Sequence, residues 1–137
     1  MKNTLYIFLS LIIVSCAKDD DTAKIELTDP LIGVWLSEGT IEEEDGELIY
    51  TFTLTYNSDN TGSSNVTFSF DGESEIENEL LTWENKDLDF TATSQTYNII
   101  YAGEEYGNEE KFIFSDDFKT LQFDGDDDEG INPFIKQ

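Results

Sequence analysis

After residue 30, apolar and polar residues alternate with a period of two along most of the chain. This is the pattern of half-buried antiparallel strands. In the clearest run, 48–56, large apolar residues form one face and threonines most of the other. Shorter runs with the same alternation lie at 32–41, 66–70, 81–83, 88–92, 97–101, 112–114 and 121–123. The sequence therefore predicts about eight short strands.

Segments rich in Asn, Asp, Gly and Ser separate these runs, at 57–62, 71–72, 85–87 and 115–119. Such segments are typical of hairpin connections. Residues 73–81 are the one candidate for a short helical turn, supported only by Ile76 and Leu80. Strands joined by hairpins indicate an all-β fold, a small up-and-down antiparallel β-barrel whose closure removes exposed sheet edges. A two-sheet β-sandwich is the alternative.

The chain begins with Lys2 and an apolar run at 5–14. Such a run is too short to span a bilayer, which needs about 20 apolar residues, but it suits a secretory signal peptide. It ends in Ile13-Val14-Ser15-Cys16, which resembles the bacterial lipobox. The resemblance implies cleavage before Cys16 and a membrane anchor of lipid on that cysteine. The alternative is an ordinary secretory leader with an incidental cysteine.

The residues after the cysteine, Lys18, Asp19, Asp20 and Asp21, resemble the surface-export signal of Bacteroidetes lipoproteins. The resemblance implies a lipid-anchored protein on the exterior face of the outer membrane. The alternative is a solvated acidic spacer. We expect a signal peptide at 1–15, a lipidated acidic tether at 16–28 and one barrel domain at 29–137.

The charge balance excludes several classes of partner. The chain has 31 acidic and 7 basic residues, a net charge of −24. Such a surface repels nucleic acid and anionic lipid headgroups. With no histidine and a single cysteine, the chain lacks an internal disulfide, the usual zinc sites and the Ser-His-Asp and Cys-His nucleophile systems. We therefore expect no catalytic residues, no metal and no cofactor.

Short motifs in the predicted barrel resemble the lipocalin-like domain of small Bacteroidetes lipoproteins. They are Gly33-x-Trp35 near the domain start, a strand–turn–Thr-Gly element at 56–62, Trp83 in a middle strand and a late hairpin ending at 121–123. The resemblance implies a lipocalin-like barrel, and lipocalins as a family bind small apolar molecules. It does not imply which ligand, since one fold hosts many functions.

If the barrel holds a ligand, inward aromatic residues would line the pocket, and the tyrosine hydroxyls among them would make its polar contacts. These candidates are Trp35, Tyr50, Phe52, Trp83, Tyr97 and Tyr101. The alternative is that these side chains fill the core, as aromatic residues at strand spacing usually do. The protein would then be a structural or interaction lipoprotein without a small-molecule ligand.

Two segments have calcium-loop character. Residues 57–62 begin like an EF-hand loop, but the twelfth position is Phe68 instead of Glu, so we expect a hairpin turn. The segment from Asp124 to Glu129 has five carboxylates, which is compatible with weak divalent-cation binding. Acidic clusters at 42–45 and 104–110 contain carboxylate pairs, but loop acids are usually solvated, so we do not expect an enzyme.

Overall fold

The computed structural model describes residues 27–125 and 130–137, and these residues form a closed barrel of eight antiparallel strands. Each strand pairs with the next along the chain, and β8 pairs with β1. The predicted up-and-down barrel is thereby confirmed, and the sandwich alternative is wrong. The strands are β1 (Gly33–Glu43), β2 (Gly46–Tyr56), β3 (Thr61–Phe70), β4 (Glu73–Asn85), β5 (Ser94–Tyr101), β6 (Asn108–Phe114), β7 (Thr120–Phe123) and β8 (Phe134–Lys136).

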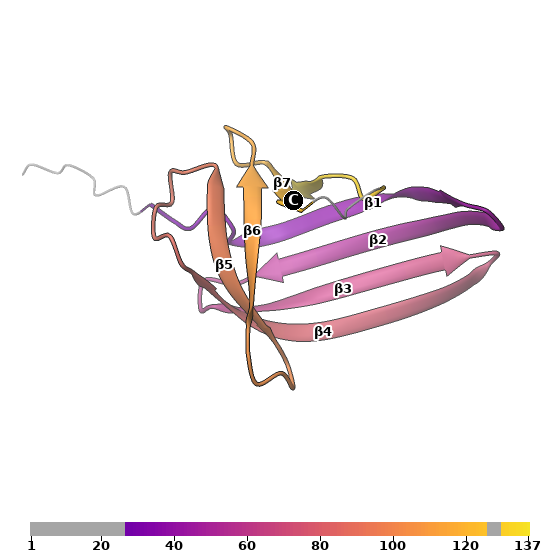
Figure 1. Ribbon diagram of the computed structural model, residues 1–137, viewed down its shortest axis with the longest axis horizontal. Coiled ribbons are helices and arrows are strands. Elements are labelled where there is room, and N and C mark those ends of the chain that lie inside the picture. The colour runs from indigo at the N-terminus through magenta and orange to yellow at the C-terminus, as the bar shows by residue number, and fades with distance from the viewer. Residues whose placement is uncertain (1–26, 126–129) are drawn as a thin grey trace, which may run out of the picture.

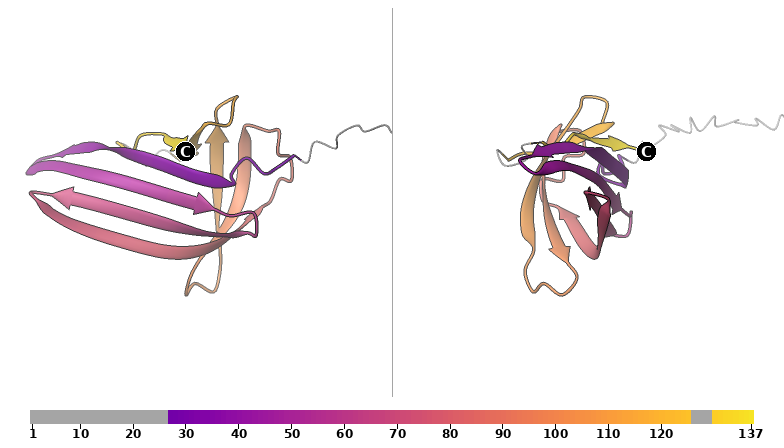
Figure 2. Two further views of the ribbon diagram at one scale, coloured as in Figure 1. Left: turned by 180° about the vertical axis from the view of Figure 1, so that it is seen from behind. Right: turned by 90° about the vertical axis from the view of Figure 1, so that its right-hand side faces the viewer.

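The barrel closes over only part of its length, because its strands differ greatly in length. The hairpins β1–β2 and β3–β4 are long, and they project side by side beyond the crossing strands β5 and β6 (Figure 1). On one side β5 pairs with β4 only over Leu81–Asn85. On the other, β8 pairs only with Trp35 and Leu36 of β1. The molecule therefore has a closed end, where all eight strands meet, and an extension of four strands (Figure 2).

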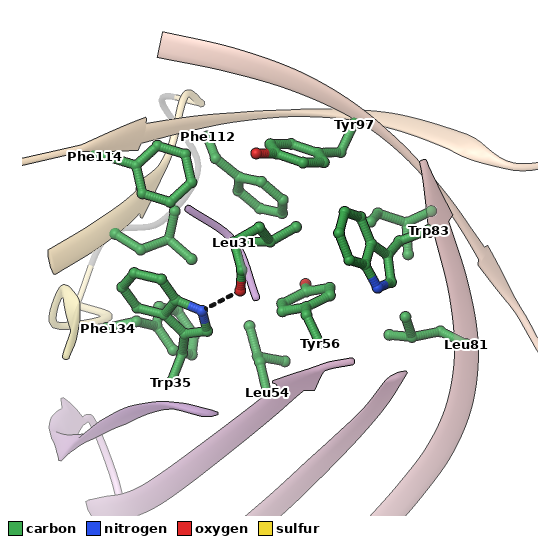
Figure 3. Close-up of a cluster of buried hydrophobic side chains, with 12 residues drawn as sticks. Leu31, Trp35, Leu54, Tyr56, Leu81, Trp83, Tyr97, Phe112, Phe114 and Phe134 are labelled. Atoms are coloured by element: carbon green, nitrogen blue, oxygen red, sulfur yellow. Dashed lines mark hydrogen bonds between the residues drawn. The ribbon is translucent and has the colours of Figure 1, made fainter. Parts of the chain in front are cut away.

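The core fills the closed end. Twelve buried side chains pack there into one cluster (Figure 3). Aromatic rings of the cluster are in direct contact, with Tyr97 at 5.3 Å from Phe112 and at 5.9 Å from Trp83 between centroids. The cluster consists of Leu31, Trp35, Leu54, Tyr56, Leu81, Trp83, Tyr97, Ile99, Phe112, Phe114, Leu121 and Phe134. Period-two alternation places every strand member of this set on the inner face.

Residues 88–92 are not a strand, although they alternate, and Phe90 is a half-buried loop residue. Here the side chain of Asn85 competes with strand pairing. Its Oδ1 accepts hydrogen bonds from the backbone N–H groups of Asp87 and Leu88, at 2.9 and 3.1 Å. Leu88 also has a φ of 56°, which an extended strand does not allow. The eighth strand is instead β8, which the alternation did not predict.

The short helical turn considered at 73–81 is also wrong, because this stretch belongs to β4 and pairs with β3 from Glu73 to Thr82. The turn before it forms as predicted. Asp71 and Gly72 both have positive φ, 50° and 83°, which is the two-residue hairpin turn that matches strand twist. Strand pairing to β3 therefore overrides the weak helical signal.

Candidate functional site

Three of the predicted ligand-binding residues lie in the core at the closed end. Trp35 and Tyr97 are 0% exposed and Trp83 is 5% exposed. Trp83 and Tyr97 contact each other at 5.9 Å between ring centroids, and the Trp35 indole N–H donates a 2.8 Å hydrogen bond to the Leu31 carbonyl (Figure 3). All three side chains therefore form part of the packed core.

A buried polar network, which the sequence pattern did not predict, lies at this closed end. Asp29 Oδ2 accepts a 2.9 Å hydrogen bond from the Asn85 side-chain amide, which also donates to Gln95 Oε1 at 2.7 Å. Asp29 Oδ1 accepts from the Tyr97 hydroxyl at 2.7 Å. Burial, followed by the bond to Asp29, raises the pKa of the Tyr97 hydroxyl. The signal available in the sequence was only a set of scattered polar residues at inward positions.

Lys136 of β8 lies at the same end, at the edge of the core. Its ammonium lies 5.1 Å from the centroid of the Trp35 ring and donates a 2.8 Å hydrogen bond to the Pro30 carbonyl. Partial burial lowers the pKa of this ammonium. The Gly33-x-Trp35 motif is thus held between the turn that precedes it and the last strand.

Tyr50 and Phe52 lie where the closed end passes into the four-stranded extension. The Tyr50 hydroxyl accepts a 2.7 Å hydrogen bond from the Asn132 backbone N–H and donates to the Gly130 carbonyl at 3.2 Å. The ring of Phe52 contacts the rings of Phe134 and Phe68, at 6.2 and 5.6 Å between centroids. The Tyr50 and Tyr97 hydroxyls therefore both bond to groups of the protein itself.

Tyr101, the third tyrosine predicted to offer polar contacts, lies apart from the other two. It is half-buried and lines a groove of about 640 Å³ together with Leu80 and Ile100, where β4 begins to pair with β5. Burial raises the pKa of its hydroxyl, and the negative charge of Glu110 adds to this. The three tyrosines do not share one pocket.

In the described part of the chain, the extension leaves apolar side chains only partly covered on its inner face. Register places Leu48 opposite Phe70, and Phe52 opposite Val66, on β2 and β3. None of these is fully buried, and Phe70 is 38% exposed. We call this surface the open face, and it consists of Leu48, Phe52, Val66, Phe68 and Phe70.

A row of four glutamates borders the open face. Glu73, Glu75 and Glu77 of β4 lie opposite Phe70, Phe68 and Val66 of β3, and Glu79 continues the row. All four are exposed. At the hairpin tip, Leu48, Phe68, Phe70 and two of these glutamates line a pocket of about 490 Å³. The surface therefore combines partly exposed rings with negative charge along one side.

The loop at 57–62 is a hairpin turn, as expected. Asp59 Oδ1 accepts hydrogen bonds from the hydroxyl and the backbone N–H of Thr61, at 2.5 and 3.0 Å. The Thr61 hydroxyl lowers the pKa of the Asp59 carboxyl. Among the residues that the structure describes, no three His, Cys, Asp or Glu side chains gather as a metal site. Much of the second calcium-like segment, up to Glu129, lies outside them.

Cys16, the predicted anchor, and Lys18, Asp19, Asp20 and Asp21, the predicted export signal, also lie outside the described residues. Within the described part of the chain, no helix has the length and apolarity to cross a membrane. Comparison of the chain with family models, with curated proteins and with solved structures finds no match. The interpretation of the open face therefore depends on its own geometry.

Proposed function

We propose that this protein is a lipid-anchored binding module of the cell surface, with the packed barrel as its scaffold and the open face as its binding surface. One observation carries the proposal. In the described part of the chain, apolar side chains on the inner side of a sheet remain only partly covered, whereas the barrel interior beside them is filled by twelve side chains. Uncovered apolar patches on secreted domains mark binding surfaces. The proposed role is non-catalytic, since the chain lacks histidine and the acids beside the open face are solvated.

The two ends of the molecule suit display from a membrane. The described chain begins at Leu27 at the closed end, and the tips of the two long hairpins lie at the opposite end (Figure 1). A lipid on Cys16 would hold the closed end towards the membrane and direct the hairpins outward. The acidic residues from Asp19 to Asp21 would keep this tether solvated and would serve as the export signal.

The chemistry of the open face defines the class of ligand. Its rings favour an apolar group, since burying apolar surface gives about 25 cal/mol per Å². The glutamate row beside them favours a cation and repels anions such as phosphate or carboxylate. We therefore propose a ligand or partner that is amphiphilic, with positive charge next to its apolar part.

Titration with Nile red, a neutral apolar dye, tests the binding role. We expect saturable fluorescence enhancement by the wild type and affinity about tenfold lower in Phe68→Ser, because that ring is half-buried on the open face. Ile49→Ser is the matched control, since Ile49 is 52% exposed and points to the other side of β2. An equal effect of both substitutions, or no saturable binding by the wild type, would refute the proposal.

The anchor is tested separately. Metabolic labelling with a fatty acid should mark the wild type, and Cys16→Ser should abolish the label. Replacing Lys18 to Asp21 by alanine should then reduce antibody access on intact cells without removing the lipid. Mass spectrometry of a mature N-terminus with no acyl chain would disprove the anchor.

A further inference from the structure

The stretch of β4 beside the open face is the edge of a sheet. Residues 73–80 pair with β3 on one side, and pairing with β5 on the other side begins only at Leu81. No other described strand pairs with this stretch. A long strand edge of this kind can accept a further strand by backbone hydrogen bonding.

The hairpin turn determines which backbone groups face outward. The two-residue turn at Asp71-Gly72 makes Phe70 and Glu73 the first bonded pair, so bonded and non-bonded positions alternate from there. The N–H and C=O groups of Ser74, Ile76 and Asn78 then point away from β3. By the same alternation the Leu80 carbonyl points away from β3, and it accepts a 2.8 Å hydrogen bond from the Ala102 N–H.

The side chains along this edge divide into two kinds. The inner side presents the glutamate row, with a carboxylate at every second position. The outer side presents Ile76 and Leu80, which are 63% and 69% exposed. Leu80 also lines the groove of about 640 Å³ into which the edge leads. An added strand would thus meet negative charge on one face and apolar surface on the other.

We infer that this edge binds an extended peptide segment of another protein, in which basic residues alternate with apolar ones. Directly opposed side chains on neighbouring strands lie about 4.5–5.5 Å apart, so lysine or arginine on the inner side would pair with the glutamates. The long aliphatic stems of these residues would pack along the stems of the glutamates. The alternate apolar residues would pack beside Ile76 and Leu80.

A second copy of this chain does not fit the same edge. Antiparallel pairing of two β4 edges would place glutamate near glutamate, and like charges opposed across strands are destabilising. The net charge of −24 adds long-range repulsion. The row therefore protects the edge from self-association while it selects a cationic partner.

The test uses the barrel with an eight-residue peptide that alternates Lys and Val, and a control peptide with the same residues as one Lys block and one Val block. We expect saturable binding of the alternating peptide only. Hydrogen exchange, read by NMR, should show new protection of the Ser74, Ile76 and Asn78 amides. Glu75→Gln combined with Glu77→Gln should weaken binding about threefold to tenfold, whereas the same change at Glu43 and Glu44, on the other hairpin tip, should not.

Equal binding of both peptides, or no protection of those three amides, would overturn the inference. The inference rests on the proposed binding role of the open face, and the dye titration keeps the two apart. If Nile red binding depends on Phe68 but the peptide leaves the amides unprotected, only the peptide inference falls. If neither probe binds, the proposed function falls with it.

Discussion

The Tyr97 hydroxyl donates a 2.7 Å hydrogen bond to Asp29 Oδ1, although 68 positions separate the two residues. The same carboxylate accepts from the Leu31 backbone N–H at 2.9 Å and is only 7% exposed. The bond therefore ties the start of the barrel domain to β5, at the closed end. A buried carboxylate needs such donors, since an unpaired buried charge is costly.

Tyr97→Phe removes this donor and leaves the ring in place. We expect a loss of about 2 kcal/mol in the free energy of unfolding, because hydrogen bonds to charged groups contribute about 1.5–3 kcal/mol. For a domain of this size 1 kcal/mol corresponds to about 4–8 °C, so the melting temperature should fall by about 8–16 °C. Thermal unfolding followed by circular dichroism measures the change. Tyr106→Phe is the control, since Tyr106 is 77% exposed, and an equal shift in both variants would contradict the role of the bond.

Buried tyrosines make the barrel sensitive to alkali. Tyr56 is 3% exposed, and burial raises the pKa of its hydroxyl far above the ordinary value. Above pH 10 the unfolded chain loses this proton and the folded chain keeps it, so stability present at lower pH is lost as pH rises. The contribution of one such group falls by about 1.4 kcal/mol per pH unit.

Urea unfolding of the wild type and Tyr56→Phe, between pH 8 and pH 11, measures this contribution. The difference in the free energy of unfolding should be constant up to about pH 10 and then change in favour of the variant, with the slope of a single proton. The lysines titrate in the same pH range, but both proteins contain them, so their contribution cancels in the difference between the two free energies of unfolding. Parallel curves over the whole range would show that Tyr56 does not titrate differently in the two states.

The alternation of apolar and polar residues was sufficient to predict the barrel, because burial on one face of a strand is a local property of sequence. It located β2 almost to its ends. It missed β8, which has three residues and becomes a strand through its pairing with β1 and β7. It also assigned a strand at 88–92, where a single side chain, Asn85, redirects the backbone.

The open face could not be predicted for a different reason. The same alternation marks a residue that packs in a core and one that lines a binding surface, so Trp83 and Phe52 looked alike in the sequence. Which of them is covered depends on where β5 to β8 end relative to the long hairpins. In β4 the inner positions of the extension are glutamates. The apolar alternation therefore marks only the part of this strand that begins at Leu81.

Tyr50→Phe should loosen the segment that leads to β8. The variant loses the bonds to the Asn132 N–H and the Gly130 carbonyl. We expect a modest loss of stability, about 1–2 kcal/mol, and faster hydrogen exchange of the Asn132 amide. Exchange of the Ile99 amide in β5 serves as the internal control and should change only as much as global stability does. Unchanged exchange at Asn132 would show that the hydroxyl does not hold this segment.

The glycine of the Thr-Gly element has a steric role that can be separated from backbone freedom. A Cβ on Gly62 would overlap the Thr55 carbonyl oxygen and come within 2.8 Å of Leu81 Cδ1, although its φ is not positive. Gly72 is the opposite case, with open space around it and a φ of 83°. Gly62→Ala should therefore cost about 1–3 kcal/mol through strain in the packed barrel, and Gly72→Ala about 1 kcal/mol through its backbone conformation.

The two variants also differ in where they should act. Gly62 lies opposite Leu81, at the junction with the closed end, so its substitution should lower the melting temperature of the whole domain. Gly72 lies at the tip of the β3–β4 hairpin, so its substitution should mainly speed hydrogen exchange near Phe70 and Glu73. Melting curves and residue-level exchange of both variants test this. A Gly62→Ala variant as stable as the wild type would mean that the strands can separate there at no cost, contrary to the packing described.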